Sequence, residues 1–181
     1  MIPDIHILDC TELSVNLDNN NYEESAVTKN KYGDVDRGYK LATLRGLVDD
    51  TGIAEEIRFG AMNIHDFKLS EEMLKTTPVL KSGDILINDR GFLDIEFINY
   101  LKIERKVDTY VLLRSNMVAY QTAVSAAQSE KNWENHSSRE NQKIAFVSDL
   151  GPLWESDNNR NDVPINASVV WDVETDDYFV L

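Results

Sequence analysis

Residues 83–96 of the chain read GDILINDRGFLDIE. Residues 85–87, Ile-Leu-Ile, form a short continuous apolar run, which is typical of a strand buried in the middle of a sheet. Asp89 follows almost directly, and residues 93–102 then carry apolar side chains at helical spacing. The stretch therefore predicts a central strand, a carboxylate at its C-terminal end, and a helix after it.

The residues before this stretch predict a sheet that begins with antiparallel strands. Residues 5–13 indicate a strand with Asp9 near its end, and residues 39–48 and 53–59 indicate a hairpin. The polar residues 16–38 read as a long exposed connection with a short helix around residues 22–27. Helical spacing predicts a helix over residues 66–75. With strands expected over 85–87 and 110–113, the order predicts an α/β fold with an antiparallel start and parallel units afterwards.

The chain changes character near residue 115, where we place a domain boundary. Residues 1–115 are expected to form a partial α/β core, and residues 116–181 a β-rich insertion subdomain. A helix is expected over residues 117–127, followed by strands at 143–147, 167–173 and 178–181. The sequence ends within an apolar strand, so we expect the subdomain to be truncated.

Composition limits the classes of protein and of partner. The chain has 181 residues, of which 42% are hydrophobic, which is enough for a sizeable core. Cys10 is the only cysteine, so no disulfide can form within the chain, and we expect a reducing cytoplasm and no membrane. The net charge of −14 repels nucleic acid at long range, so basic regions that grip phosphate would have to lie elsewhere in a full-length protein.

Asp9 and Asp89 occupy corresponding places, each near the C-terminal end of an expected central strand. If these strands are neighbours, the carboxylates share the crevice in which α/β sheets bind ligands. Two hard oxygen ligands at short range favour Mg²⁺ or Mn²⁺. The alternative is that both aspartates merely begin loops.

Four segments in this order resemble the catalytic core of DDE transposases of the insertion-sequence-four family: HILDCTEL, RGYKLATLRGLVDDTG, GAMNIHD and DILINDRGFLDIEFINYL. The resemblance implies an RNase H-like mixed sheet with flanking helices, interrupted by a β-rich insertion. It also implies that Asp9 is the first acid and Asp89, in the D-R-G-[FY] element, is the second. Both would be catalytic residues and metal ligands.

The sequence departs from the family at the third acid. The family carries it as a glutamate in a Tyr-x2-Arg-x3-Glu-x6-Lys signature, and no stretch of this chain has that spacing. The resemblance therefore implies a chain that is truncated before the third acid, binds metal weakly and cleaves little. Glu174 and Asp172 are poor substitutes because they lie in strand-like sequence.

Several other residues allow two interpretations each. Arg90 could neutralise a phosphate or pair with Asp94. Trp133, with the other two tryptophans, could stack on an unpaired DNA base or belong to the core of the subdomain. Asp66 recurs in the resemblance, but it also suits a helix N-cap. The segment DNNRND, residues 157–162, imitates a calcium loop but lacks its glycine and glutamate, which favours a solvated loop.

The function that these observations predict is that of a fragment of a bacterial or archaeal DNA transposase, a metal-dependent enzyme that cleaves and joins strands at element ends. Its partners would be the transposon ends and target DNA, with a homodimer in the DNA complex. One alternative is an RNase H-like nuclease without strand transfer. The other is a non-enzymatic remnant or interaction module whose acids are structural.

Overall fold

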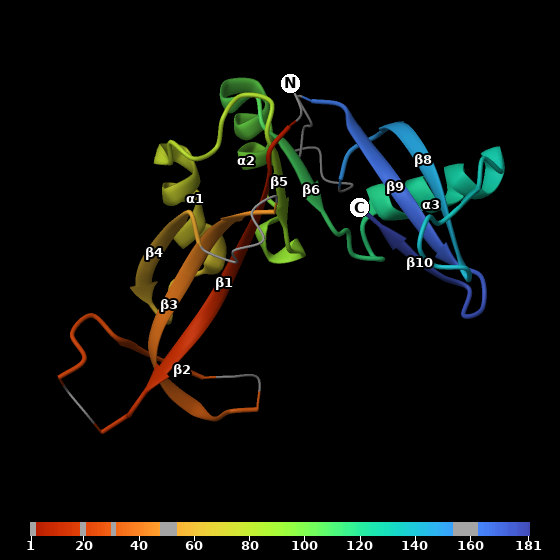
Figure 1. Cartoon of the computed structure of the whole chain (residues 1–181). Helices are drawn as coiled ribbons and strands as arrows, with labels where there is room; N and C mark the ends of the chain where they lie inside the picture. The colour runs from red at the N-terminus through yellow and green to blue at the C-terminus, as the bar shows by residue number, and fades with distance from the viewer. Residues whose placement is uncertain (1–2, 19–20, 30–31, 48–53, 154–162) are drawn as a thin grey trace. The chain divides into compact units, whose positions relative to one another are not determined.

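Two strands from distant parts of the sequence, β1 (Ile5–Val15) and β5 (Ile85–Asn88), pair with each other in the computed structural model of the chain (Figure 1). The structure describes residues 3–18, 21–29, 32–47, 54–153 and 163–181. The chain forms two compact units, of which the first contains residues 1–92 with 105–109 and the second contains residues 93–104 with 110–181.

The first unit is built on a mixed sheet in which the described strands have the order β2-β3-β1-β5-β6. β3 (Val35–Gly46) pairs antiparallel with β1 along one edge, and with β2 (Ala26–Lys29) and β4 (Glu56–Ala61) along the other. β5 is parallel to β1, and β6 (Asp108–Val111) lies beside β5. The predicted α/β class, with an antiparallel start and a parallel continuation, is confirmed.

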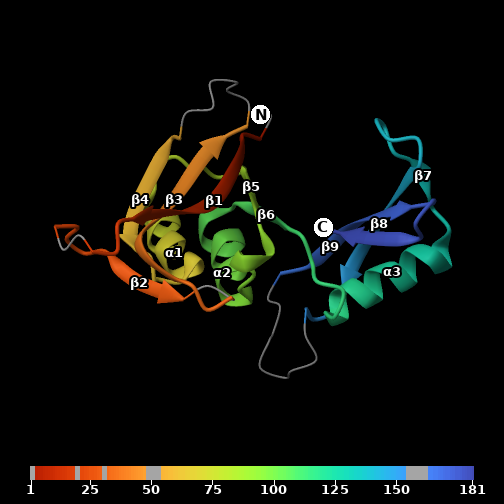
Figure 2. The same cartoon turned by 90° about the horizontal axis from the view of Figure 1, so that it is seen from below.

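Helix α1 (Asp66–Thr76) covers one face of this sheet (Figure 2). Its buried side chains recur at helical spacing, as the sequence predicted, and alternate residues of the strands meet them. The buried apolar residues on this side include Leu8, Ala42, Leu44, Leu86, Leu69, Met73 and Leu74. The opposite face is more open, since Ile57 and Phe59 of β4 are 53% and 61% exposed. The two faces of the sheet therefore differ in how well they are covered.

The polar residues 16–38 contain more regular structure than the sequence indicated. The short helix expected around residues 22–27 is wrong, because Ala26–Lys29 form strand β2 and β3 already begins at Val35. These strands are held by pairing with each other, and most of their side chains remain partly or fully exposed. The hairpin of β3 and β4 is confirmed, while its expected turn at residues 49–52 lies outside the described residues.

The second unit contains an antiparallel sheet in which the described strands have the order β10-β9-β8-β7. Their bounds are Glu134–Asn135 for β7, Gln142–Leu150 for β8, Ile165–Asp172 for β9 and Asp177–Val180 for β10. Helix α3 (Val118–Glu130) packs Ala123 and Ala127 against the buried residues of this sheet. The helix and the three strands that the sequence predicted for this region are all present.

Helix α2 (Ile95–Tyr100) belongs to the second unit and continues as a π-helical turn, Leu101–Arg105. Ile95 joins a buried cluster with Met117, Ala119 and Leu153. The division into compact units therefore differs from a boundary near residue 115, because the α2 segment packs with residues that follow that point.

No helix in the described parts of the chain is long and apolar enough to cross a membrane.

Arg105 holds the C-terminal end of α1 to the segment that follows it. Its Nη1 atom donates to the carbonyls of Leu74 and Lys75, each at 3.0 Å, and Nη2 donates to those of Thr77 and Leu80, each at 2.9 Å. The last carbonyls of a helix lack intrahelical donors and carry the negative end of the helix dipole. One guanidinium therefore satisfies four backbone acceptors, which makes Arg105 a C-terminal cap of α1.

We predict that Arg105→Ala lowers the free energy of unfolding of the first unit by about 2–3 kcal/mol, because hydrogen bonds from a charged donor are lost. Amide exchange of β1 and β3 measures this change. Tryptophan fluorescence reports only the second unit, since Trp133, Trp154 and Trp171 all follow residue 109. The stability of Arg105→Lys should lie between those of the wild type and Arg105→Ala. Arg139→Ala, at an exposed arginine, is the control. Unchanged exchange in Arg105→Ala would refute the capping role.

Candidate functional site

The parallel register of β1 and β5 brings Asp9 and Asp89 to corresponding positions. The paired residues run from Ile5 with Ile85 to Leu8 with Asn88. Asp9 and Asp89 each follow the last pair by one residue. Side chains alternate along a strand, so Asp9 lies on the face that carries Ile7. Asp89 is the first residue after β5, and we expect its side chain to continue the face of Ile87. The sequence correctly expected neighbouring strands and placed Asp89 at the C-terminal end of one of them. The expected position of Asp9 near the end of its strand is wrong, because β1 continues through Asp9 to Val15 by pairing with β3.

The backbone around each aspartate orients its carboxylate. Oδ1 of Asp9 accepts a hydrogen bond from the N–H of Cys10 at 2.8 Å, and Oδ1 of Asp89 accepts one from the N–H of Arg90 at 2.6 Å. The chain leaves β5 through a 3₁₀ turn, Arg90–Phe92, in which the Phe92 N–H donates to the Asp89 carbonyl. Both side chains are exposed, and no other described residue donates a hydrogen bond to their second oxygens.

The same face of the sheet carries a cation that the sequence did not single out. Arg45 of β3 pairs with Ile7, and Thr43 pairs with Asp9, so both side chains lie on the side of the two aspartates. Arg45 is exposed. The alternation of side chains along β3 could have shown which residues share a face with Arg45. Only the register of β1 with β3 shows that Asp9 lies on the same face.

The donor set suits a hard divalent cation in its chemistry but not in its number of ligands. Carboxylate oxygens are the ligands of Mg²⁺ and Mn²⁺. Among the described residues, no group of three or more histidine, cysteine, aspartate or glutamate side chains is placed to hold a metal. The amide oxygen of Asn88 is buried without a hydrogen-bond partner in the described chain, but by alternation it lies on the α1 side. Asp9 and Asp89 are therefore the two candidate ligands among the described residues of this site.

On the α1 side of the sheet, polar side chains near Asp9 pair with one another. Burial is the main effect on Cys10 and raises the pKa of its thiol, while a hydrogen bond with Ser70 opposes this shift. Asp66 forms an ion pair with the buried Lys40 at 2.5 Å. The expected capping role of Asp66 is wrong, because the ring of His65 accepts the Phe67 N–H instead. A neutral thiol and a paired carboxylate leave the chemistry of this region to Asp9 and Asp89.

Arg90 and Trp133, the two residues expected to contact DNA, lie in different units. Arg90 is exposed in the turn after β5, and its expected ion-pair partner Asp94 caps α2 by accepting the Phe97 N–H at 2.9 Å. Trp133 packs against Trp171, with ring centroids 5.4 Å apart, and against Tyr178 at 6.3 Å. Trp133 thus extends the core of the second unit, and its stacking on a base stays a prediction.

Asp172 and Glu174, which were considered as substitutes for the third acid, lie at the turn between β9 and β10. Burial works to raise the pKa of the Asp172 carboxyl, but hydrogen bonds from Thr175, Gln142 and the Glu174 N–H together lower it below its usual value. Glu174 itself is exposed in the turn between β9 and β10. Asp172 therefore stabilises this turn. The segment at 157–162 lies outside the described residues.

A cavity of about 530 Å³ lies at the other end of β1 and contains a second cluster of ionisable groups. Buried His6 places Nδ1 2.9 Å from Glu55 and Nε2 3.2 Å from Asp84. Asp84 also accepts the Lys81 N–H at 2.7 Å. These carboxylates already have partners in the protein, so the cluster joins β1 to the segments around it and resembles a structural network more than a binding site.

Comparison with known proteins found no matching family model, no similar curated protein and no similar solved structure.

We predict that Asp9→Asn and Asp89→Asn each stabilise the metal-free first unit by about 0.3–1 kcal/mol, because like charges on adjacent strands repel. The double variant should gain no more than either single variant, since one substitution already removes the repulsion. Amide exchange of β1 in chelator measures these changes, and the gain should shrink at high salt.

Asp18→Asn is the matched control, because it removes an exposed charge away from this pair and reports only the effect of lowering the net charge. Two results would show that the two carboxylates do not interact. One is a gain in unfolding free energy no larger than that of Asp18→Asn, and the other is a gain of the double variant that equals the sum of the two single gains.

Proposed function

We propose that this chain is part of the RNase H-like catalytic core of a DDE transposase, in which Asp9 and Asp89 are the first and second acids. The observation that carries the proposal is the register of β1 and β5, in which two exposed aspartates each come directly after the last residue pair of the two parallel strands. The mixed sheet and the β-rich second unit are compatible with the architecture that the sequence resemblance implies.

Asp9 and Asp89 would hold Mg²⁺ or Mn²⁺ through the carboxylate oxygens that the backbone leaves available. When bound, such ions activate a water or a 3′-hydroxyl and stabilise the leaving oxygen of a phosphodiester. In that reaction the attacking oxygen forms a bond to phosphorus as the P–O3′ bond breaks. The protein's own task is to present the aspartates on rigid strands, so that the ligands need little reorganisation.

Two cations support a phosphodiester as the substrate. Arg45 shares the face of Asp9, and Arg90 directly follows Asp89. Guanidinium groups bind phosphate oxygens in pairs of hydrogen bonds, which would offset the repulsion between DNA and an acidic chain. A third acid would complete the site, and the described residues place none beside these two. We therefore propose weak metal binding and little cleavage for this chain alone.

The proposal is tested by titrating ¹⁵N-labelled protein with Mn²⁺, whose unpaired electrons broaden nearby amide resonances. We expect the residues around Asp9 and Asp89 to broaden first, with dissociation constants on the order of millimolar because only two carboxylates bind. Excess Mg²⁺ should restore the resonances by competition. Asp89→Asn should abolish the selective broadening, and the control Asp18→Asn should retain it.

Broadening that is centred elsewhere, such as on residues 157–162, would contradict the assigned site. The same samples can be mixed with a DNA duplex to test the requirement for a third acid. Clean strand cleavage that Asp89→Asn abolishes would show that an acid within this chain completes the site, and Glu174 would be the first residue to examine.

A further inference from the structure

Strand β1 is much longer than its partner β5, so one edge of β1 is only partly paired. β1 pairs with β3 from His6 to Val15, but with β5 only from Ile5 to Leu8. Beyond Leu8, no strand among the described residues pairs with this second edge. β1, β2 and β3 extend together as an arm of the first unit, residues 9–18, 21–29 and 32–38 (Figure 1).

The hydrogen bonds at the start of β1 show which backbone groups face the open edge. The Ile5 carbonyl accepts from Leu47 at 2.7 Å, and the Asp4 carbonyl accepts from Ile85 of β5 at 2.9 Å. Successive residues of a strand direct their backbone groups to opposite edges, so even-numbered residues of β1 face the β5 side. Cys10, Glu12 and Ser14 therefore direct N–H and C=O groups to the open edge. Within the described parts of the chain, only the Cys10 N–H among these groups has a partner, the Asp9 carboxylate.

This edge lacks most of the features that usually protect exposed strands. Proteins protect edges with charged side chains, above all lysine, and with proline, bulges or very short strands. The charged residues of this edge, Asp9 and Glu12, are both acidic. Residues 9–15, DCTELSV, contain no proline and no lysine, and the pairing of β1 with β3 runs without a register shift. The other described edge strands are shorter: β4 has 6 residues and includes Arg58, β2, β6 and β10 have 4 each, and β7 has 2. The part of β8 that β7 does not pair, residues 145–150, contains a register shift. The free part of β1 is thus the longest regular open edge in the described chain.

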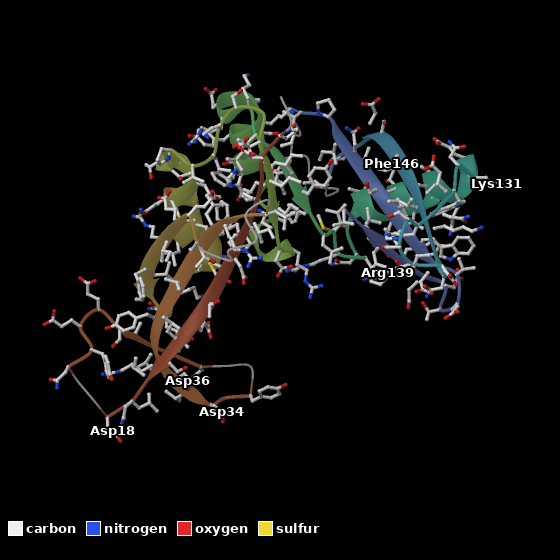
Figure 3. The ribbon with its side chains drawn as sticks, in the orientation of Figure 1. Asp18, Asp34, Asp36, Lys131, Arg139 and Phe146 are labelled. Carbon is white, nitrogen blue, oxygen red and sulfur yellow. The ribbon has the colours of Figure 1, made fainter. Side chains whose placement is uncertain are left out.

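The arm is strongly acidic around this edge. Its described residues carry seven acidic side chains against two basic ones, Lys29 and Arg37. The acids are Asp9, Glu12, Asp18, Glu23, Glu24, Asp34 and Asp36. Figure 3 shows Asp18, Asp34 and Asp36 near the end of the arm. Apolar side chains lie among them, such as Leu13 at 39% exposure and Val35 at 40%.

We propose that the open edge of β1 binds an extended, basic segment of another protein, which adds to the sheet as a further strand. The backbone groups of Cys10, Glu12 and Ser14 would pair with the added strand, as in other cases of strand addition. Glu12 already lies 3.7 Å from Nζ of Lys40, but its side chain is 58% exposed. Glu12 and the neighbouring acids would therefore pair with lysine or arginine side chains of the added strand, and Leu13 and Val15 would contact apolar ones. This inference does not rest on the proposed function.

Charge separates this ligand from two others. Nucleic acid offers no strand of amide groups and is repelled by the seven acids. A second copy of β1 would bring Glu12 and Asp9 against the same residues of the partner, and like charges on paired strands are destabilising. A basic polypeptide satisfies both the backbone groups and the charges.

The test uses ¹⁵N-labelled protein and a synthetic peptide of about eight residues in which lysine alternates with valine or threonine. In the free protein we expect the amides of Glu12 and Ser14 to exchange at least about 10-fold faster than those of Thr11 and Leu13, which donate to β3. The peptide should slow the exchange of Glu12 and Ser14 by about 10-fold or more at saturation. A peptide with glutamate in place of lysine should have no effect.

Two variants examine the two parts of the interaction. Ser14→Pro removes a donor that the β1–β3 ladder does not use, and it should abolish protection by the peptide while Thr11 and Leu13 stay protected. Glu12→Gln keeps the backbone and should weaken binding several-fold, whereas Glu140→Gln, at an exposed acid of the second unit, should not.

Three outcomes would overturn the proposal: no protection at about 1 mM lysine peptide, a range in which strand addition is detectable; equal protection by the glutamate peptide; or self-association of the protein that Ser14→Pro abolishes. The last outcome would assign the edge to a second copy of the chain.

Discussion

The parallel pairing of four residues of β1 with four residues of β5 is the constraint on which the rest of the first unit depends. It joins the antiparallel strands to the later part of the sheet, and it fixes the position of Asp89 relative to Asp9. A shift of one residue in this register would move one aspartate to the α1 side, because side chains alternate between faces. Register, more than residue identity, therefore makes the two acids a candidate site.

The short length of β5 has two consequences. The chain leaves the sheet at Asp89 through the 3₁₀ turn Arg90–Phe92, which exposes the carboxylate where the pairing ends. From the same point onward β1 continues without a described neighbour on the β5 side, and the backbone groups that face this side become available to an added strand. The candidate metal ligands and the open edge thus have one structural origin, and Asp9 belongs to both.

Much of the fold could be predicted from sequence because burial leaves a pattern. The apolar run at 85–87, the helical spacing of α1 and the strands after residue 140 all correspond to elements of the structure. β2 and the start of β3 could not be predicted, since cross-strand pairing holds them and most of their residues are partly exposed. The packing of α2 with the second unit also depends on contacts that local sequence does not report.

The candidate site was predictable to a similar degree. The positions of Asp9 and Asp89 after apolar runs identified the acids, but Arg45 entered only through the register of β1 with β3. The role of Asp66 was mispredicted because its carboxylate pairs with the buried Lys40 of β3 and not with the N-terminus of α1. Capping of α1 by Arg105 likewise joins residues about 30 positions apart, which spacing cannot indicate.

Formation of a disulfide between positions 9 and 89 would report whether the two aspartates lie side by side. Residues on adjacent strands with side chains on one face meet the distance and direction that a disulfide requires. In a Cys10→Ser background, we expect Asp9→Cys with Asp89→Cys to oxidise completely under mild conditions without loss of the fold. The pair Asp9→Cys with Asn88→Cys, whose side chains lie on opposite faces, should remain reduced. If the first pair stays reduced, or if the second oxidises as readily, Asp9 and Asp89 do not form one site.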